Sequence, residues 1–420
     1  MLLRFAFENV FSFAEATEWS AVQTSLKERL FDDIQHSSPL GKERVLRASV
    51  LYGANASGKS NWMRAWKFFA HTVLESDSLE EALAHAPRFA LDAAGAGKRI
   101  RFEVEFVWHS VRYRYGWCAE ASGYLEEWLF EKKTREVPVF ERRGAQVVAA
   151  RGRAGLQQIV QNNLLPAGGL LVGLGAQFND SACRAFLEAM RSVCCLESFP
   201  GRGFVPWAET ARLMAERPEF KDRVQAFLGQ ADFGTNGLSL ASRSAALGWV
   251  AEPSVAPEIR SLRPFVEPDG SLVLREFSFA EFESKGTQKL LSLAGPMLRA
   301  LETGGVLWVD DLDTHLHPHV LEALVRLFYR EDWNPHGAQL LFTTHNTHLL
   351  GARVFRRDQI YAVEKDAFGV SRANALSDFK RSGRSPRNDH DLQANYLDGR
   401  FGGVPGWLGF EPTTQEGGVL

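Results

Sequence analysis

Hydrophobic and polar positions alternate at the start of the chain and again after residue 100. Residues 3–7 and 10–13 place apolar side chains at every second position or close to it, which predicts a strand, a turn and a second strand. Residues 100–140 alternate in the same way and are interrupted by Ala-Ser-Gly at 121–123. This second stretch predicts an antiparallel meander of strands.

A different order, in which strands alternate with helices, follows elsewhere in the chain. The apolar run 45–52 enters a glycine-rich loop and then an amphipathic helix at about 60–70, whereas residues 157–242 have largely helical spacing without sustained heptads. Further on we expect strands at 272–279, 306–309 and 339–342, and helices at 287–302 and 318–329. Because the later strands alternate with helices, a mostly parallel sheet is expected there.

These patterns predict an α/β protein whose mixed sheet carries an antiparallel meander and a short helical insertion. Four parts are expected: an N-terminal lobe over 1–150, a mainly helical insertion over 151–265, a C-terminal lobe over 266–372 and an extension over 373–420. The missing heptads argue against a long coiled-coil arm in the insertion.

Composition and charge narrow the class of protein. With 45% hydrophobic and 24% charged residues in 420, the chain is expected to fold around a large core. Its formal net charge of −3 supplies no global basic field, so any nucleic-acid contact requires a local patch. The longest uncharged apolar stretch, 164–176, is short and glycine-rich, and the opening residues contain acids. We therefore expect a cytoplasmic protein without a membrane segment or signal peptide.

Residues 53–60, GANASGKS, fit the phosphate-binding pattern G-x-x-x-x-G-K-[ST] between a predicted strand and a predicted helix. In such a loop the backbone N–H groups converge on phosphate oxygens at a helix N-terminus. Lys59 would supply a positive charge to the β- and γ-phosphates, and the Ser60 hydroxyl would reach Mg²⁺. The loop therefore predicts binding of a nucleoside triphosphate with magnesium.

A second acidic site is expected on a strand neighbouring the one that enters this loop. The apolar strand 306–309 ends at Asp310 and Asp311. Asp310 would hold magnesium, directly or through water, and Asp311 would orient or deprotonate the attacking water. This pairing is typical of enzymes that hydrolyse the nucleotide.

Two other clusters leave alternatives open. His315, His317 and His319 are ligand-type residues, but their spacing crosses Pro318 and lacks a companion Cys or acid set of recognised metal spacing, so it does not favour a metal site. A basic region could face DNA or RNA, or could equally be a solvated or partner surface. It comprises Arg353, Arg356, Arg357, Lys380, Arg381, Arg384 and Arg387.

Several motifs, taken in order, resemble one protein family. They are FENVFSF at 7–13, NASGKSN at 55–61, ESKGTQK at 283–289, DLDTHLHP at 311–318, TTHN at 343–346 and YLDGRFGGVP at 396–405. The chain resembles ABC-type ATPases related to SMC proteins and RecF. Within them it is similar to the RloA-like stand-alone ATPases of bacterial anti-phage, abortive-infection systems.

The resemblance implies a head-to-tail dimer, or a higher homo-oligomer, with each ATP sandwiched between the P-loop of one subunit and the signature of the other. Ser284 and Gly286 would contact the γ-phosphate in trans, Asp313 would lie at the subunit interface, and His345 would sense the same phosphate. The residues implied to cradle the nucleotide within one subunit are Asn55, Ala56, Ser57, Gly58, Lys59, Ser60 and Asn61. Lys59, Asp311 and His345 would act in catalysis.

Two departures from the family pattern bear on activity. Relatives usually carry Glu after the first acid, whereas the shorter Asp311 sets its carboxylate back by about 1.5 Å, a misplacement that can cost about a hundredfold in rate. We therefore expect slow ATP hydrolysis. No Gln occurs between Asn61 and Ala145, so the family's Q-loop glutamine has no counterpart there.

The favoured function is an ATPase that regulates a separately encoded effector, a nuclease or a toxin, in anti-phage defence. The segment after His345 is too short for an appended nuclease domain, so this chain is expected to cut nothing itself. DNA or a phage protein could be the trigger. Two alternatives stay open: a RecF-like DNA-repair ATPase that binds duplex DNA, and a scaffold clamped by ATP with little turnover.

Overall fold

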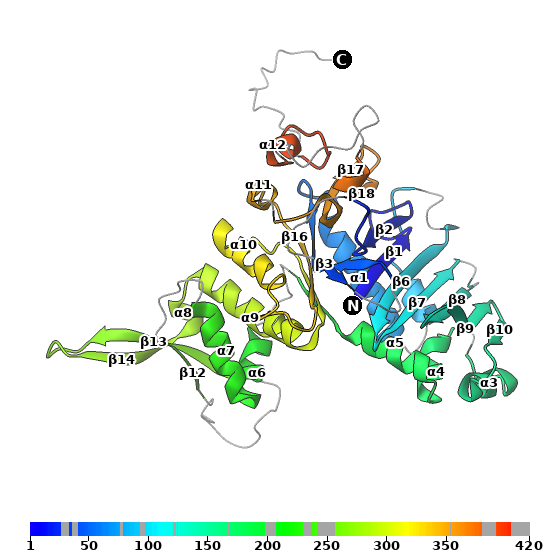
Figure 1. The fold of residues 1–420 in the computed structure, drawn as a ribbon, viewed down its shortest axis with the longest axis horizontal. Helices are drawn as coiled ribbons and strands as arrows, with labels where there is room; N and C mark the ends of the chain where they lie inside the picture. Colours follow the sequence, from blue (N-terminus) through cyan, green and yellow to red (C-terminus); the bar gives the residue numbers. More distant parts are fainter. Residues whose placement is uncertain are drawn as a thin grey trace, which may run out of the picture.

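The structure is a computed structural model of the 420-residue chain. It describes residues 1–26, 33–35, 41–75, 79–92, 97–120, 123, 125–166, 168–197, 207–229, 237–241, 257–352, 354–379 and 392–404. A six-stranded sheet lies at its centre, a seven-stranded sheet lies on one side, and a smaller sheet lies on the opposite side (Figure 1). The expected mixed α/β architecture is confirmed.

A seven-stranded antiparallel sheet forms one side of the molecule. Its spatial order is β10-β9-β8-β7-β6-β1-β2. The strands are β1 (Leu2–Glu8), β2 (Thr17–Ser20), β6 (Ile100–Trp108), β7 (Val111–Ala119), β8 (Leu125–Lys132), β9 (Glu136–Arg143) and β10 (Gln146–Ala149). Consecutive strands from β6 to β10 pair with one another, which confirms the predicted meander.

A six-stranded sheet lies beside it in the order β11-β15-β16-β5-β17-β18. The strands are β11 (Val193–Leu196), β15 (Val306–Val309), β16 (Gln339–Thr343), β5 (Ala48–Tyr52), β17 (Ile360–Lys365) and β18 (Ser371–Ala375). Neighbouring strands from β11 to β17 run parallel, and β18 is an antiparallel edge. The sheet is therefore mostly parallel, as expected, and its carboxyl ends share one edge.

Smaller strand pairs and the helices complete the structure. The remaining strands are β3 (Asp33–Gln35), β4 (Arg44–Leu46), β12 (Leu238–Ala241), β13 (Glu258–Val266) and β14 (Leu272–Ser278). The helices are α1 (Lys59–Leu74), α2 (Leu79–Ala84), α3 (Ala154–Gln161), α4 (Leu171–Gln177), α5 (Ser181–Arg191), α6 (Ala208–Glu216), α7 (Pro218–Gly229), α8 (Phe279–Phe282), α9 (Lys285–Thr303), α10 (Pro318–Leu327), α11 (His348–Gly351) and α12 (Leu392–Leu397). Short 3₁₀ turns occupy Arg357–Gln359 and Leu376–Asp378.

Helix α1 is held between the two large sheets by aromatic packing. Trp66 packs edge-on against Phe5 of β1, with ring centroids 5.1 Å apart, and lies 5.8 Å from the ring of Trp308 on β15. Trp62 contacts Phe7 at 5.5 Å. Rings of this size bury much apolar surface, so they fix the helix that follows the P-loop against both sheets.

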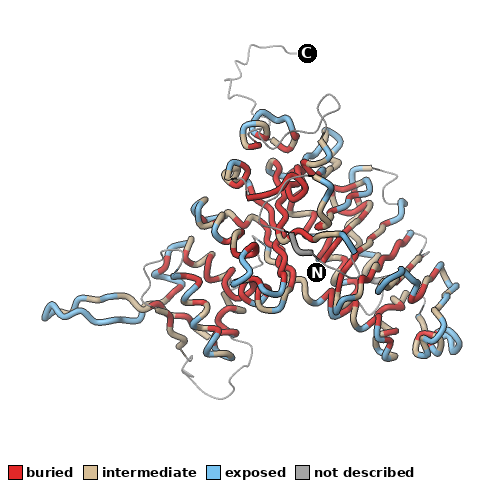
Figure 2. Tube along the Cα trace, viewed as in Figure 1, coloured by how far each residue is buried: buried red, intermediate tan, exposed pale blue. Residues whose placement is uncertain are grey.

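The six-stranded sheet is buried on both faces (Figure 2). Side chains alternate along β15, so Val306 and Trp308 join the core shared with α1, whereas Leu307 and Val309 join the core shared with α9 and α10. Only a strand covered on both sides has this continuous apolar sequence. The β13–β14 hairpin, in which β14 is largely exposed, projects from the end of the molecule opposite the seven-stranded sheet (Figure 1).

The predicted second strand at 10–13 is wrong. Val10 and Phe13 instead close a tight turn through two reciprocal backbone hydrogen bonds of 2.9 Å, with Asn9 and Phe11 at positive φ. Both Val10 and Phe13 are fully buried by the turn. Their apolar character therefore reflects a turn folded into the core, and the strand that pairs with β1 comes later, at β2.

Residues 151–265 contain helices α3 to α7, but they do not form one separate insertion. Strand β11 lies within this segment and pairs with β15 as the edge of the six-stranded sheet. The segment's later strands, β12 and β13, pair with β14 in a separate three-stranded sheet. No described helix of the segment exceeds the 12 residues of α7, in agreement with the absence of heptads.

Candidate active site

The predicted P-loop connects β5 to α1 at the carboxyl edge of the parallel sheet. Gly58, at φ +119°, has the backbone conformation that only glycine adopts without strain. A Cβ on Gly53 would lie 2.4 Å from the carbonyl oxygen of Val363, so this position also requires glycine. Asn55 and Ala56 are exposed at the tip of the loop, while Ser57, Gly58 and Lys59 are buried.

The Lys59 ammonium group lies inside the loop. Its Nζ donates hydrogen bonds to the carbonyl oxygens of Gly53 at 2.8 Å and Ala54 at 3.0 Å. Burial lowers the pKa of Lys59, and the negative charges of Asp311, Asp310 and Asp313 offset part of that effect. The ammonium group therefore lies within the influence of the acidic strand end.

Strand β16 lies between β5 and β15, which corrects the expectation that the acidic strand neighbours the P-loop strand. Thr343, at the end of β16, forms hydrogen bonds to both Asp310 and Asp311. Its Oγ1 donates to Oδ1 of Asp310 at 2.7 Å and accepts from the backbone N–H of Asp311 at 2.7 Å, and Oδ1 of Asp311 lies 3.3 Å away. One hydroxyl therefore positions both predicted acids.

We expect Thr343→Val to lower ATP turnover by about 10- to 100-fold while changing ATP affinity little, because the lost hydroxyl orients the acids without contacting the phosphates. Single-turnover hydrolysis and nucleotide titration measure the two effects. Thr343→Ser keeps the hydroxyl and should retain most of the activity. Equal activity of the Val and wild-type proteins would contradict this role.

His345 follows Thr343 and lies close to the acids. Its Nε2 is 3.9 Å from Oδ1 of Asp311, and its backbone N–H donates to Oδ2 of Asp313 at 3.4 Å. Burial and the positive charge of Lys59 lower the pKa of His345, although the three aspartates oppose this. The imidazole is therefore neutral at neutral pH, with one ring nitrogen free to donate a hydrogen bond and the other to accept one.

Ser284 and Gly286, which are expected to contact a phosphate in trans, lie at the N-terminal end of α9. Ser284 is exposed and caps α9 by accepting a hydrogen bond from the N–H of Thr287 at 3.2 Å. A Cβ on Gly286 would lie 3.0 Å from the carbonyl oxygen of His315. In the described residues no hydrogen bond joins Ser284 or Gly286 to the P-loop, and α8, just before them, lies well apart from α1 in Figure 1.

Lys289, one turn further along α9, was not assigned by the sequence analysis. Its Nζ lies 3.5 Å from the backbone oxygen of Asp311, and burial lowers its pKa against the opposing charge of the aspartates. Its place three residues after Gly286, on the same helix face, was the available signal. This lysine connects the helix of the signature to the acidic strand end.

Three segments distant in sequence pack against the P-loop or the helix that follows it. Ser371 Oγ donates to the Ser57 carbonyl at 2.6 Å and lies 2.8 Å from Ser12 Oγ, which accepts a hydrogen bond from Asn61 Nδ2 at 2.9 Å. The described tail reaches the same place, since a Cβ on Gly403 would lie 3.3 Å from the Cα of Gly53. The opening motif and the tail motif therefore both brace the loop.

Part of the predicted basic region is buried in the structure. Arg356 is fully buried, and its guanidinium pairs with both carboxylate oxygens of Asp358 at 2.9 Å. Arg357 is only 6% exposed. Arg353 and residues 380–387 lie outside the described part of the chain. Arg356 and Arg357 therefore do not form a surface for nucleic acid.

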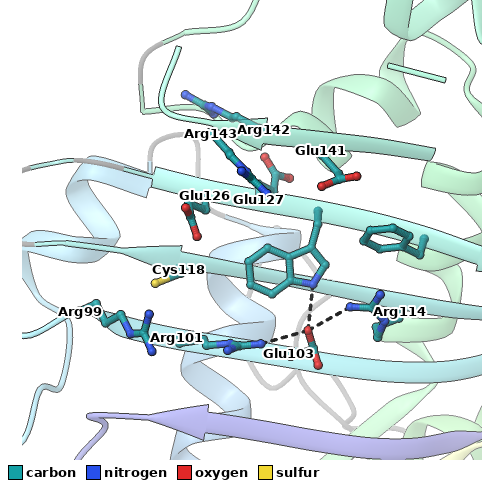
Figure 3. Close-up of a pocket in the computed structure, with 12 residues that line it drawn as sticks. Arg99, Arg101, Glu103, Arg114, Cys118, Glu126, Glu127, Glu141, Arg142 and Arg143 are labelled. Atoms are coloured by element: carbon teal, nitrogen blue, oxygen red, sulfur yellow. Dashed lines mark hydrogen bonds and ion pairs between the residues drawn. The ribbon is translucent and has the colours of Figure 1, made fainter. Parts of the chain in front are cut away.

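A separate hollow on the outer face of the seven-stranded sheet contains none of the predicted site residues (Figure 3). There Arg101, Arg114 and the indole N–H of Trp128 all approach Oε2 of Glu103, at 3.4, 3.4 and 3.0 Å. The central acid of this hollow is satisfied by the protein itself.

The residues at the carboxyl edge of the parallel sheet fit a magnesium nucleotide. Ser57 Oγ and Asp313 Oδ1 are buried without a hydrogen-bond partner in the described structure, so the hydroxyl could donate to or accept from a bound group and the carboxylate oxygen could accept from one. Asp310 and Ser60 offer the hard oxygen ligands that magnesium prefers. Lys59, Asp310, Asp311 and His345 lie together at this edge, where Thr343 contacts both aspartates and the charges of the aspartates act on Lys59 and His345.

The family follows from a match that spans most of these residues. Residues 48–144 and 227–351, together more than half of the chain, match the family model described as "AAA domain, putative AbiEii toxin, Type IV TA system". The chain belongs to this family, AAA_21. The AAA_21 match includes the P-loop, the acidic strand end and His345, so the chain carries an ATPase-like, nucleotide-binding domain of P-loop α/β fold.

No curated protein matches this AAA_21 chain. Among solved structures, the SMC head domain from Thermotoga maritima is similar to it, with 15% sequence identity and a TM-score of 0.44. That similarity covers 89% of this chain and 98% of the other. In the described residues, no helix of the AAA_21 chain has the length and apolar character needed to cross a bilayer.

Proposed function

We propose that the protein binds and slowly hydrolyses ATP, forms a head-to-tail dimer around it, and regulates a separately encoded effector in anti-phage defence. The observation that carries the proposal is the convergence of Lys59, Asp310, Asp311 and His345 at one sheet edge. The family description, which mentions a toxin of a type IV toxin–antitoxin system, supports a role in defence.

In the proposed reaction a water oxygen attacks the γ-phosphorus as the bond to the β-phosphate oxygen breaks. Lys59 and the loop N–H groups hold the phosphates, and Asp311 orients the water and receives its proton. His345 contacts the γ-phosphate and loses that contact when phosphate leaves. Magnesium, held by Ser60 and Asp310, would neutralise charge on the phosphates.

Dimerisation is proposed from the location of the signature. Ser284 is exposed at the N-terminus of α9, on a part of the subunit separate from its own P-loop. A helix N-terminus with an exposed serine favours a phosphate group. In a head-to-tail pair, Ser284 and Gly286 of one subunit would meet the γ-phosphate held by the other, with Asp313 at the interface.

The proposed dimerisation is tested by measuring the molecular mass of the protein in solution in the presence of nucleotide. An Asp311→Asn background, in which hydrolysis is slow, should double in mass with magnesium ATP and stay a monomer with ADP, as measured by light scattering after size exclusion. Adding Ser284→Arg should abolish the dimer by blocking the phosphate contact. Thr303→Arg, an exposed position at the far end of the same helix, should leave it intact. A monomer in every nucleotide state would refute the sandwich.

One alternative retains support from a specific observation. Asp311 has a short side chain and a positive φ of 44°, which fixes its carboxylate near Thr343. If that position is too far from the water, ATP would act as a clamp that assembles a scaffold with little turnover. Single-turnover hydrolysis separates the two functions, because a clamp shows no product even with enzyme in excess.

A further inference from the structure

A cluster of metal-ligating side chains lies beside the active site, where α10 meets α11. His319 and Glu322, three residues apart, share one face of α10, and His348 is the first residue of α11. The Nε2 of His348 is 3.2 Å from Oε2 of Glu322, and the rings of His319 and His348 meet edge to face at 5.4 Å. One ligand atom from each residue lies within 4.8 Å of the other two.

The three donors match a known class of ion. Two imidazoles and one carboxylate are the protein ligands of open zinc sites, in which water takes the fourth position. Tetrahedral bonds of about 2.1 Å separate ligand atoms by roughly 3.4 Å, close to the distance between His348 and Glu322. His319 is exposed, so its side chain can rotate to complete the set. Imidazole donors favour zinc, cobalt or nickel over magnesium.

Neighbouring groups already orient these ligands. The Nε of Arg326 donates to Oε1 of Glu322 at 2.8 Å, which leaves the second carboxylate oxygen directed at His348. The backbone N–H of His348 donates to Asn346 Oδ1 at 2.9 Å and fixes the start of α11. Hydrogen bonds of this kind from neighbouring residues hold metal ligands in place before the ion binds.

We propose that His319, Glu322 and His348 bind a divalent ion of the zinc class and thereby join α10 to α11. The row of histidines at 315–319 did not predict this site, because Glu322 and His348 reach it only through the fold. Helix α10 follows the segment of Asp313, and α11 follows His345, so the ion would fix these two segments relative to each other. That last consequence rests on the proposed ATPase function.

The site is tested on the untagged full chain without nucleotide, in excess magnesium. Titration with Co²⁺ should give one equivalent of ion with the visible absorption of tetrahedral cobalt, and Zn²⁺ should displace it. His319→Ala and His348→Ala should each lose that absorption and weaken Zn²⁺ binding at least about tenfold. Glu322→Gln should do the same, because the amide is a poor ligand, and circular dichroism shows whether each variant is folded.

His71→Ala is the matched control. His71 and Glu75 also place an imidazole and a carboxylate close together, 3.7 Å apart at one turn of α1, but the described structure adds no third ligand there. This variant should bind Co²⁺ like the wild type. Absence of binding to the wild type, or binding that survives Glu322→Gln and His348→Ala, would overturn the site.

The proposed coupling has its own measurement. Zn²⁺ should change ATP turnover of the wild type at least twofold and leave His319→Ala unaffected. Because ion binding is measured without ATP, an inactive enzyme would refute the proposed ATPase without touching the metal site. Zinc that binds stoichiometrically but does not alter turnover would overturn the coupling alone.

Discussion

Replacing Lys59 with alanine is expected to reduce ATP turnover by at least about a hundredfold. The ammonium group lies within the P-loop, 2.8 Å from the Gly53 carbonyl, and is the one positive side chain of the phosphate-binding motif. Removing a preorganised charge that stabilises developing negative charge typically costs between about 10² and 10³ in rate. Steady-state and single-turnover hydrolysis of magnesium ATP measure the effect, and nucleotide titration shows how much affinity is lost.

Lys67→Ala provides the control for this experiment. Lys67 lies on the same helix, is exposed, and pairs with Glu197 at 2.6 Å, away from the loop. Its loss should leave turnover within about twofold, since an exposed ion pair contributes little. Activity of Lys59→Ala close to that of Lys67→Ala would remove the P-loop from the mechanism.

Repeating the wild-type assay with duplex DNA at two salt concentrations tests the RecF-like alternative. That alternative requires DNA to stimulate ATP turnover, and the stimulation must weaken as the salt concentration rises.

Substitution of Asp311 is expected to have the second large effect on ATP turnover. Asp311→Asn should lower turnover by about 10²- to 10⁴-fold, because the amide preserves the shape of the side chain but accepts no proton. Asp311→Glu should instead raise turnover, by up to about a hundredfold, because its carboxylate reaches about 1.5 Å further toward the water. Both variants are measured by single-turnover hydrolysis with protein in excess over ATP.

The backbone conformation of Asp311 affects how the Glu variant is expected to behave. Asp311 has φ +44°, a region that Asp tolerates better than Glu, so the longer side chain costs some stability while it gains reach. Asp332→Asn, at an exposed acid paired with Arg330, should leave turnover unchanged. A wild type that already turns over rapidly, or a Glu variant slower than the Asn variant, would refute the assignment of Asp311 as a slow base.

Local pattern was sufficient for the elements that carry the chemistry. The glycines and lysine of the P-loop have a fixed spacing because one short loop must surround a phosphate group, and the helix that follows was predicted to within a few residues. The acidic strand end at Asp310 was predicted because a buried strand has a continuous apolar sequence. These features depend on residues that are neighbours along the chain.

Other predictions failed because the same local pattern fits more than one tertiary role. Val10 and Phe13 are apolar whether they lie in a strand or in a buried turn, and the turn was found. Arg356 contributes a charge to the sequence, yet its pairing with Asp358 buries it completely. Periodicity records that a residue is charged or apolar but does not record which partner it meets.

The phosphate-binding loop, the acidic strand end, the meander and the mixed α/β class could all be predicted from short-range spacing along the chain. The fold was needed to find that Thr343 connects the two acids, that Gly403 packs on Gly53, and that His319 meets His348. The last two contacts join residues brought together by strand order and helix packing. The order of strands in a sheet depends on how all the strands and the helices between them pack together, so it is a property of the whole chain and not of any one segment.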